Sequence, residues 1–343
     1  MNITKKISHA MKIILKSIGI ICLALLALLL LAQVSFMVEC LFVDEMEYTI
    51  NIDQTTCTVI GAKKPYGNVL KIPEEIEGYT VTKIAPGAFQ EQEMHIIVLP
   101  DTIEEIGQRA FYNCPYLSRV YGIENCFRLT SIGDFAFEYC DGIRRMNLPD
   151  NILFIGEYAF YGCRIWKEPT IPANVKTIGN GAYAGCFLKE ARISESVMTI
   201  GDMAFLGCEH LMNFIVNEEN PYYTSVDGVL YSKDMKTLYC YPIGRQDEVF
   251  TIPEGVENIY YKAFALSLDL KEINLPSTIK TIGEQVFVAS KRLKLKIETI
   301  NYNGTVEMWK AIQKPQNWGD YSSNFVIVCT DGEISKDGTV TYK

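Results

Sequence analysis

The hexapeptide IGQRAF at residues 106–111 returns in near-copies along the whole chain. The other copies, including two degenerate ones, begin at Ile84, Ile132, Ile155, Ile178, Ile200, Ile259 and Ile282. The steps between these isoleucines are 22, 26, 23, 23, 22, 59 and 23 residues. A period of about 20–29 residues is typical of a solenoid, in which each unit is a short strand plus a turn or helical segment.

The longer consensus of the unit is LPxxIxxIGxxAFxxCxxLxxI, and each conserved letter has a physical role. The apolar positions are expected to point inward and to meet the same position of the next coil. Glycine allows either unusual backbone angles or a close approach of two chains. Proline ends the strand before it. The predicted stacked aromatic core is Phe89, Phe111, Phe137, Phe160, Tyr183, Phe205, Phe264 and Phe287.

The pattern resembles the BspA-like leucine-rich repeats of bacterial surface proteins. Three further segments match the family: an entry segment at 69–84, an inserted hairpin at 220–244 and a closing segment at 300–334. The resemblance implies surface-displayed, non-enzymatic recognition or adhesion without a cofactor. We therefore predict an α/β solenoid of leucine-rich-repeat type, with about eight coils of 22–26 residues and one inserted β-hairpin.

The 59-residue step divides the predicted solenoid in two. Gly228–Tyr231 and Thr237–Tyr241 are β-prone runs joined by SKDMK, which is a hairpin pattern. The expected organisation is a stub and signal segment (1–43), an N-terminal cap (44–83), repeats (84–216), the insert (217–250), further repeats (251–297) and a C-terminal cap (298–343).

The N-terminus carries an apolar run from residue 18 to residue 38, after four lysines. As a helix this run is about 31 Å long, enough to cross the hydrocarbon core of a bilayer. Two interpretations remain: a single-pass anchor in the bacterial plasma membrane with the solenoid outside, or a signal peptide that is cleaved so that the solenoid is secreted.

The charge of the chain argues against nucleic-acid binding. The net charge is −9 at pH 7, and no block of lysines and arginines offsets it. Such a surface repels phosphate backbones. A protein or glycoprotein macromolecule is the expected partner, and nothing in the sequence indicates a small-molecule substrate.

Five of the 11 cysteines form a ladder, each three residues after the repeat aromatic: Cys114, Cys140, Cys163, Cys186 and Cys208. Two later coils have serine at this position, so we interpret the ladder as buried free thiols in places that require a small residue. Disulfides between neighbouring rungs and a metal site are the alternatives. The ladder lacks the close CxxC pairs of zinc sites.

Few residues suggest catalysis. Only three histidines exist, and His95 and His210 belong to coils five steps apart. The chain contains no GxSxG, HExxH or P-loop motif. No catalytic, cofactor-binding or metal-binding residue is predicted, although hydrolysis by paired carboxylates leaves little trace in a sequence.

Two surfaces are candidates for partner binding. If the apolar strand positions are buried, Arg119, Arg144, Arg145 and Lys167 form a basic strip, which is either a docking surface for acidic partners or ordinary solvated charge. The insert has Tyr222, Tyr223 and Tyr231, expected to be exposed for recognition, unless tyrosines pack across the hairpin instead.

Together these features favour a non-enzymatic adhesion protein for host or neighbouring-cell macromolecules. A structural envelope protein that binds a component of its own cell surface is the alternative. A carboxylate-based hydrolase is a remote third interpretation.

Overall fold

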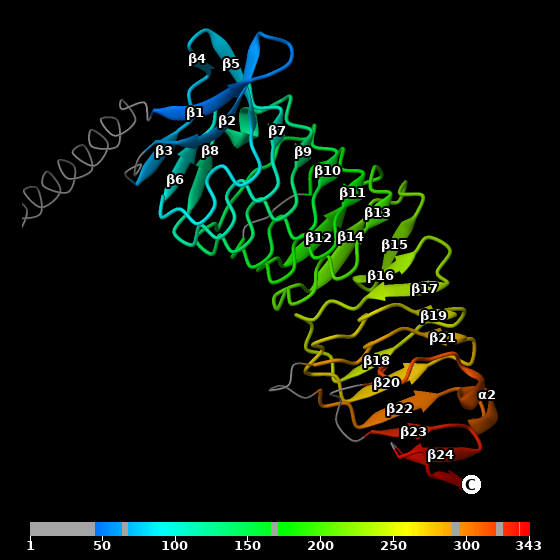
Figure 1. Cartoon of the computed structure of the whole chain (residues 1–343). Coiled ribbons are helices and arrows are strands. Elements are labelled where there is room, and N and C mark those ends of the chain that lie inside the picture. Colours follow the sequence, from blue (N-terminus) through cyan, green and yellow to red (C-terminus); the bar gives the residue numbers. More distant parts are fainter. Residues whose placement is uncertain (1–44, 64–67, 166–170, 290–294, 320–324, 336) are drawn as a thin grey trace, which may run out of the picture.

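The computed structural model describes residues 45–63, 68–165, 171–289, 295–319, 325–335 and 337–343. These residues form a bent rod of stacked coils, a β-solenoid of about eleven turns, with β1 at one end and β25 at the other (Figure 1). Each coil has three sides. Two carry parallel strands, and the third consists of turns.

The first side, here called the IG face, carries the strands that end in the IG dipeptide. Its nine-stranded sheet consists of β1 (Met46–Ile50), β2 (Thr56–Ala62), β4 (Glu75–Ile76), β5 (Tyr79–Ile84), β7 (Glu105–Ile106), β9 (Ser131–Ile132), β10 (Phe154–Ile155), β11 (Thr177–Ile178) and β13 (Thr199–Ile200). A five-stranded sheet continues this side with β15 (Tyr223–Val226), β16 (Val229–Ser232), β17 (Thr237–Cys240), β19 (Asn258–Ile259) and β21 (Thr281–Ile282). The register pairs isoleucine with isoleucine from coil to coil, as in Ile155 with Ile178.

The second side, here called the LP face, carries the strands that precede the LP or IP dipeptide. Its sheets are β3 (Val69–Lys71), β6 (Ile96–Val98) and β8 (Arg119–Tyr121), then β12 (Glu190–Ile193) and β14 (Asn213–Val216). The last sheet has six strands: β18 (Val249–Thr251), β20 (Glu272–Leu275), β22 (Thr299–Tyr302), β23 (Val326–Val328), β24 (Gly332–Ser335) and β25 (Val340–Tyr342). The segment 143–148 follows the same path without forming a strand.

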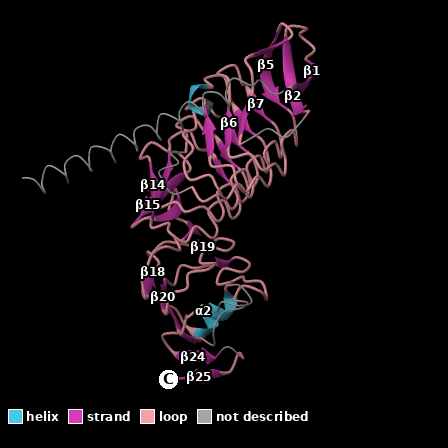
Figure 2. Ribbon diagram, turned by 90° about the vertical axis from the view of Figure 1, so that its left-hand side faces the viewer, coloured by secondary structure: helices cyan, strands magenta, loops and turns pink. Residues whose placement is uncertain are grey.

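The prediction of an α/β solenoid is wrong in its helical part. The described residues contain only a 3-10 turn, η1 (Ile123–Asn125), and one short helix, α2 (Val306–Ala311), which lies near the C-terminal end of the rod (Figure 2). A helix needs an uninterrupted run of helical backbone angles. The xAFxxC segments contain left-handed residues, such as Arg109 (φ 55°) and Asn113 (φ 53°), that interrupt such a run. Each segment therefore closes as turns.

The third side, the turn face, has its own ladder of backbone hydrogen bonds. The amides of Arg109, Phe111 and Asn113 donate to the carbonyls of the next coil at 2.7–2.8 Å, and this triplet recurs from coil to coil. Because these bonds run along the rod, the turn face adds a third row of hydrogen bonds between coils to those of the two strand faces.

All eight residues of the predicted aromatic core are at most 4% exposed. The ring centroids of Phe111 and Phe137 lie 5.2 Å apart, and those of Phe137 and Phe160 lie 5.6 Å apart. A second row of rings starts at Tyr241 of the insert, which stacks on Phe264 at 5.3 Å, and continues to Phe287 at 5.5 Å. The aromatic side chains thus touch along the axis of the rod.

The structure decides between the two roles proposed for the glycine of IG. At Gly156 the backbone is not left-handed, but a Cβ atom would lie 2.5 Å from the amide nitrogen of Asp134 in the preceding coil. Gly133 and Gly179 meet the preceding coil equally closely. Close approach of two chains, not an unusual φ, therefore requires glycine here.

The number of coils exceeds the eight predicted from the repeated phrase. Strands β2 and β17 and a bridge between Thr281 and Gln313 add turns to the IG face without any IGxxAF sequence. The cap, insert and closing segments were counted as flanking parts, but their backbones continue the parallel ladder.

The closing segment covers the last aromatic rung. Trp318 packs edge-on against Phe287 with centroids 5.9 Å apart, and Trp309 of α2 packs on Trp318 at 5.8 Å. The side chain of Thr305 caps α2 by accepting from the amide of Met308. These tryptophans cover the end of the core, which a terminal coil would otherwise expose to water.

The predicted membrane-crossing run, residues 18–38, lies outside the described part of the chain. Within the part that is described, no helix has the length and apolar character needed to cross a bilayer.

Candidate binding surfaces

The predicted basic strip follows the LP face. Arg119 lies on β8 and is exposed, while Leu117 before it is fully buried. In the next coil Ile143 is buried in the same way, and Arg144 and Arg145 are both exposed. The burial pattern thus places the three arginines on the outside of successive coils. Lys167, the fourth predicted member, lies outside the described residues.

The arginines of the strip differ in their contacts. Arg119 donates from Nη1 to the hydroxyl of Tyr121 at 2.9 Å, and its guanidinium lies 5.9 Å from the centre of that ring. Among the described residues, neither Arg144 nor Arg145 forms an ion pair. Their guanidinium groups are therefore available to an external acid.

Two basic residues further along the LP face are paired with carboxylates. Arg192 contacts Glu190 at 2.8 Å, and Lys271 contacts Glu248 at 2.7 Å. Exposed pairs of this kind contribute little stability, but they neutralise the local field. Arg144 and Arg145 differ from Arg192 and Lys271 in having no carboxylate partner among the described residues.

Only one of the three tyrosines predicted to be exposed on the insert is exposed. Tyr222 is 46% exposed, but Tyr223 and Tyr231 are only 7% and 1% exposed. The hydroxyl of Tyr223 accepts a hydrogen bond from the amide of Ile200 at 3.0 Å, at the edge of β13 where the parallel ladder stops. Because the insert displaces the next coil, this phenol satisfies a backbone group that would otherwise lack a partner. Tyr223 therefore joins the insert to the repeats.

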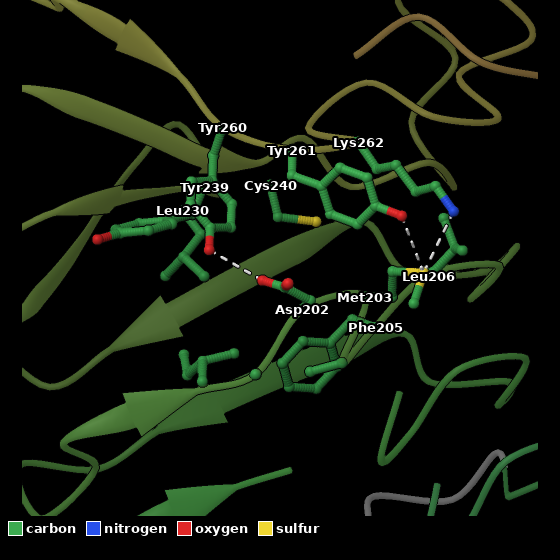
Figure 3. Close-up of a pocket in the computed structure, with 13 residues that line it drawn as sticks. Asp202, Met203, Phe205, Leu206, Leu230, Tyr239, Cys240, Tyr260, Tyr261 and Lys262 are labelled. Carbon is green, nitrogen blue, oxygen red and sulfur yellow. Dashed lines mark hydrogen bonds between the residues drawn. The ribbon is translucent and has the colours of Figure 1, made fainter. Parts of the chain in front are cut away.

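A small cavity of about 50 Å³ lies at the seam between the repeats and the insert (Figure 3). Figure 3 shows three side chains reaching across it: Tyr260 donates to Asp202 at 2.9 Å, and Tyr261 and Lys262 both approach the sulfur of Met203. Burial and the nearby Asp202 carboxylate raise the pKa of Tyr260 to about 12. A cavity of this size holds a water molecule or two but no substrate.

The cysteine ladder is buried, and the nine described cysteines are free thiols. Each ladder thiol donates to the carbonyl oxygen of the repeat aromatic one coil earlier, for example from Cys163 to Phe137 at 3.1 Å and from Cys186 to Phe160 at 3.2 Å. Burial raises the pKa of both thiols. The ladder thus adds weak polar bonds between coils, a role beyond the filling of space that the sequence suggested.

The two described histidines lie in separate surroundings. His95 stacks on Tyr116 with centroids 5.7 Å apart, and His210 packs edge-on against Phe187 at 5.1 Å. Across the described ranges, no three His, Cys, Asp or Glu side chains are grouped so that they could hold a metal ion.

An aromatic cluster on the turn face was not predicted. The ring of Phe135 stacks on Tyr158 at 5.5 Å, the guanidinium of Arg109 lies 5.2 Å from the centre of Phe135, and Tyr139 packs against Tyr161 at 5.3 Å. These residues occupy variable positions of the successive segments QRAFYN, DFAFEY and EYAFYG. Comparing the variable positions from coil to coil would have found them.

The family comparison agrees with the repeat pattern. The model of the BspA type leucine-rich repeat region matches residues 82–212 and 244–307, in six copies. No curated protein is similar enough to count as a match.

Solved structures show the same fold. A leucine-rich cell surface protein from Faecalibacterium prausnitzii has a TM-score of 0.58 and 21% sequence identity, covering 78% of this chain and 96% of its own. The pneumococcal vaccine antigen PcpA has a TM-score of 0.57 and 20% identity, covering 76% and 81%. A leucine-rich repeat protein from Eubacterium ventriosum has a TM-score of 0.53 and 21% identity, covering 76% and 70%.

Proposed function

This chain belongs to the BspA-type leucine-rich repeat proteins, and from that premise we propose that it is a noncovalent recognition protein displayed on a bacterial surface. Its work is adhesion to proteins or glycoproteins of a host or of neighbouring cells. The proposal assigns it no cofactor and no catalytic group.

The observation that carries the proposal is the exposed, unpaired pair Arg144 and Arg145 on a chain of net charge −9. The negative charge of the chain repels acidic partners except where they approach a local positive region. Guanidinium groups in such a region bind carboxylates and sulfates in a bidentate manner. With Arg119 in the adjacent coil, the strip fits an acidic macromolecule such as a sialylated or sulfated glycoprotein.

The test is a charge reversal in the full chain. Arg144→Glu/Arg145→Glu is compared with Arg128→Glu/Lys176→Glu, which changes the net charge equally at exposed sites outside the strip. Binding is measured to mucins, to matrix proteins and to an envelope extract of the source organism. We expect loss of mucin or matrix binding in the strip variant only. If both variants bind as the unmodified chain does, the strip has no role in recognition.

The same panel tests the alternative function, a structural envelope protein. Retention on the envelope extract alone would favour that role over adhesion. Incubation with glycans and peptides is expected to give no hydrolysis products. Hydrolysis that disappears when the protein is unfolded would overturn the non-enzymatic assignment.

Residues 18–38 are proposed to anchor the protein, or to direct its secretion before cleavage. N-terminal sequencing of the mature protein distinguishes these possibilities. An intact N-terminus in the membrane fraction supports an anchor. A protein in the medium whose new N-terminus lies within or after residues 18–38 supports secretion.

A further inference from the structure

The strand ladder of the LP face is interrupted at the insert. One sheet ends at β14, and the next begins at β18. The tip of the inserted hairpin covers the edge of β14, because the amide of Phe214 donates to the carbonyl oxygen of Gly228 at 2.8 Å. No described segment covers the facing edge of β18 in the same way.

The hydrogen bonds of β18 show which of its backbone groups remain open. The amide of Ile252 donates to Asn274 at 2.9 Å, and the carbonyl oxygen of Glu248 accepts from Glu272 at 3.0 Å. Since alternate residues of a strand point their backbone groups to opposite sides, Val249 and Thr251 direct theirs away from β20. Within the described ranges these groups have no backbone partner.

A groove of about 710 Å³ runs along this open edge. Its walls include Met212 and Asp227 on one side and Val249 and Thr251 on the other. Met212 is 42% exposed and Val249 is 52% exposed, so apolar surface flanks the open backbone groups. The groove is thus apolar along its walls and polar along the strand edge.

The charged groups of the groove leave it negative. Arg245 donates from Nε to Asp247 at 2.5 Å, and Nη1 donates to the backbone carbonyl of Asp227. The carboxylate of Asp227 itself is exposed and has no ion pair among the described residues. The groove therefore contains one guanidinium and two carboxylates, and the carboxylate of Asp227 is the one without a cationic partner among the described residues.

We propose that the edge of β18 binds an extended polypeptide segment of a partner protein, which adds a strand to the LP face. In an extended polypeptide the backbone donors and acceptors on one edge repeat at every second residue, roughly 6.6 Å apart. The outward backbone groups of Val249 and Thr251 have the same two-residue spacing, so they can pair with such a segment. Its alternate side chains are apolar, against Met212 and Val249, and a basic residue lies opposite Asp227. The site is separate from the arginine strip and does not depend on it.

The experiment uses the full chain and a displayed library of random 12-residue peptides. We expect enriched peptides to alternate apolar and polar residues and to carry a lysine or arginine. Val249→Pro removes the outward amide without touching the bonds to β20, and it should weaken binding about tenfold, whereas Val249→Thr keeps the amide and should bind nearly as well.

Hydrogen exchange of the unmodified chain gives a measurement that needs no variant. The amides of Val249 and Thr251 should exchange quickly in the free protein and become protected when an enriched peptide is bound. The proposal is overturned by a library with no enrichment, by peptides that leave both amides unprotected, by equal binding of Val249→Pro and Val249→Thr, or by a groove that binds only glycans.

Discussion

Replacing Phe137 by alanine tests the central packing feature of the rod. This ring is fully buried and lies between Phe111 at 5.2 Å and Phe160 at 5.6 Å. Truncation of a buried phenylalanine costs about 3–5 kcal/mol, depending on how far the surroundings collapse into the space. Collapse is restricted here, because the amide of Phe137 is bonded to Ala159 of the next coil at 2.8 Å. We therefore expect a loss near the upper end, about 4–5 kcal/mol.

The assay is urea unfolding followed by far-ultraviolet circular dichroism, with Phe127→Ala as the matched control. Phe127 is 73% exposed, so its truncation should change the free energy of unfolding by less than about 0.5 kcal/mol. A loss of about 4 kcal/mol is a large part of a typical stability of about 5–15 kcal/mol. Equal effects of the two substitutions would refute the stacking argument.

Three further predictions follow from the contacts between coils. Gly156→Ala should lower the free energy of unfolding in urea by about 2 kcal/mol or more, because its Cβ would lie 2.5 Å from the amide nitrogen of Asp134. Gly61→Ala, whose Cβ would have its nearest atom at 3.5 Å, should lower it by less than about 1 kcal/mol. Equal losses in the two variants would contradict this prediction. Tyr223→Phe should lower the free energy of unfolding by about 1 kcal/mol through the lost bond to Ile200, and an unchanged value would show that water replaces it. Burial raises the thiol pKa of four ladder residues: Cys140, Cys163, Cys186 and Cys208. At pH 8 a maleimide should therefore label these thiols only after the protein is denatured. Rapid labelling of the native protein at these residues, identified by mass spectrometry, would disprove their burial.

The repeated phrase was sufficient to predict the stack of coils. Positions such as Phe111 and Cys114 recur at one place in each unit, and a residue that recurs at a fixed place in a stacked coil touches its own copies. The exposure of Arg119, Arg144 and Arg145 followed from the same logic, because the buried neighbours Leu117 and Ile143 set the direction of the side chains.

Other features depend on contacts between segments without repeat identity. Nothing local in the sequence distinguishes Tyr222, which is exposed, from Tyr223, which is buried against β13. The left-handed backbone of the turn face could not be predicted either. Arg109, Phe135 and Tyr158 occupy a repeat position with positive φ, and only the coils with Gly87 and Gly181 have glycine there. The open edge of β18 required knowledge of where the insert ends.

The seam near Met203 has a mechanical consequence. In the coil before this seam, the amides of Gly181, Tyr183 and Gly185 donate to backbone carbonyls of the coil that contains Met203. In the described ranges, the corresponding amides of Met203, Phe205 and Gly207 have no backbone acceptor in the coil that follows. Two separate apolar clusters meet at this level. Pulled from its two ends, the rod should extend here first, in two force peaks separated by an intermediate with one half still folded. A surface protein with such a seam would lengthen under shear before it dissociated from a partner. A single force peak in force spectroscopy would exclude this two-step extension.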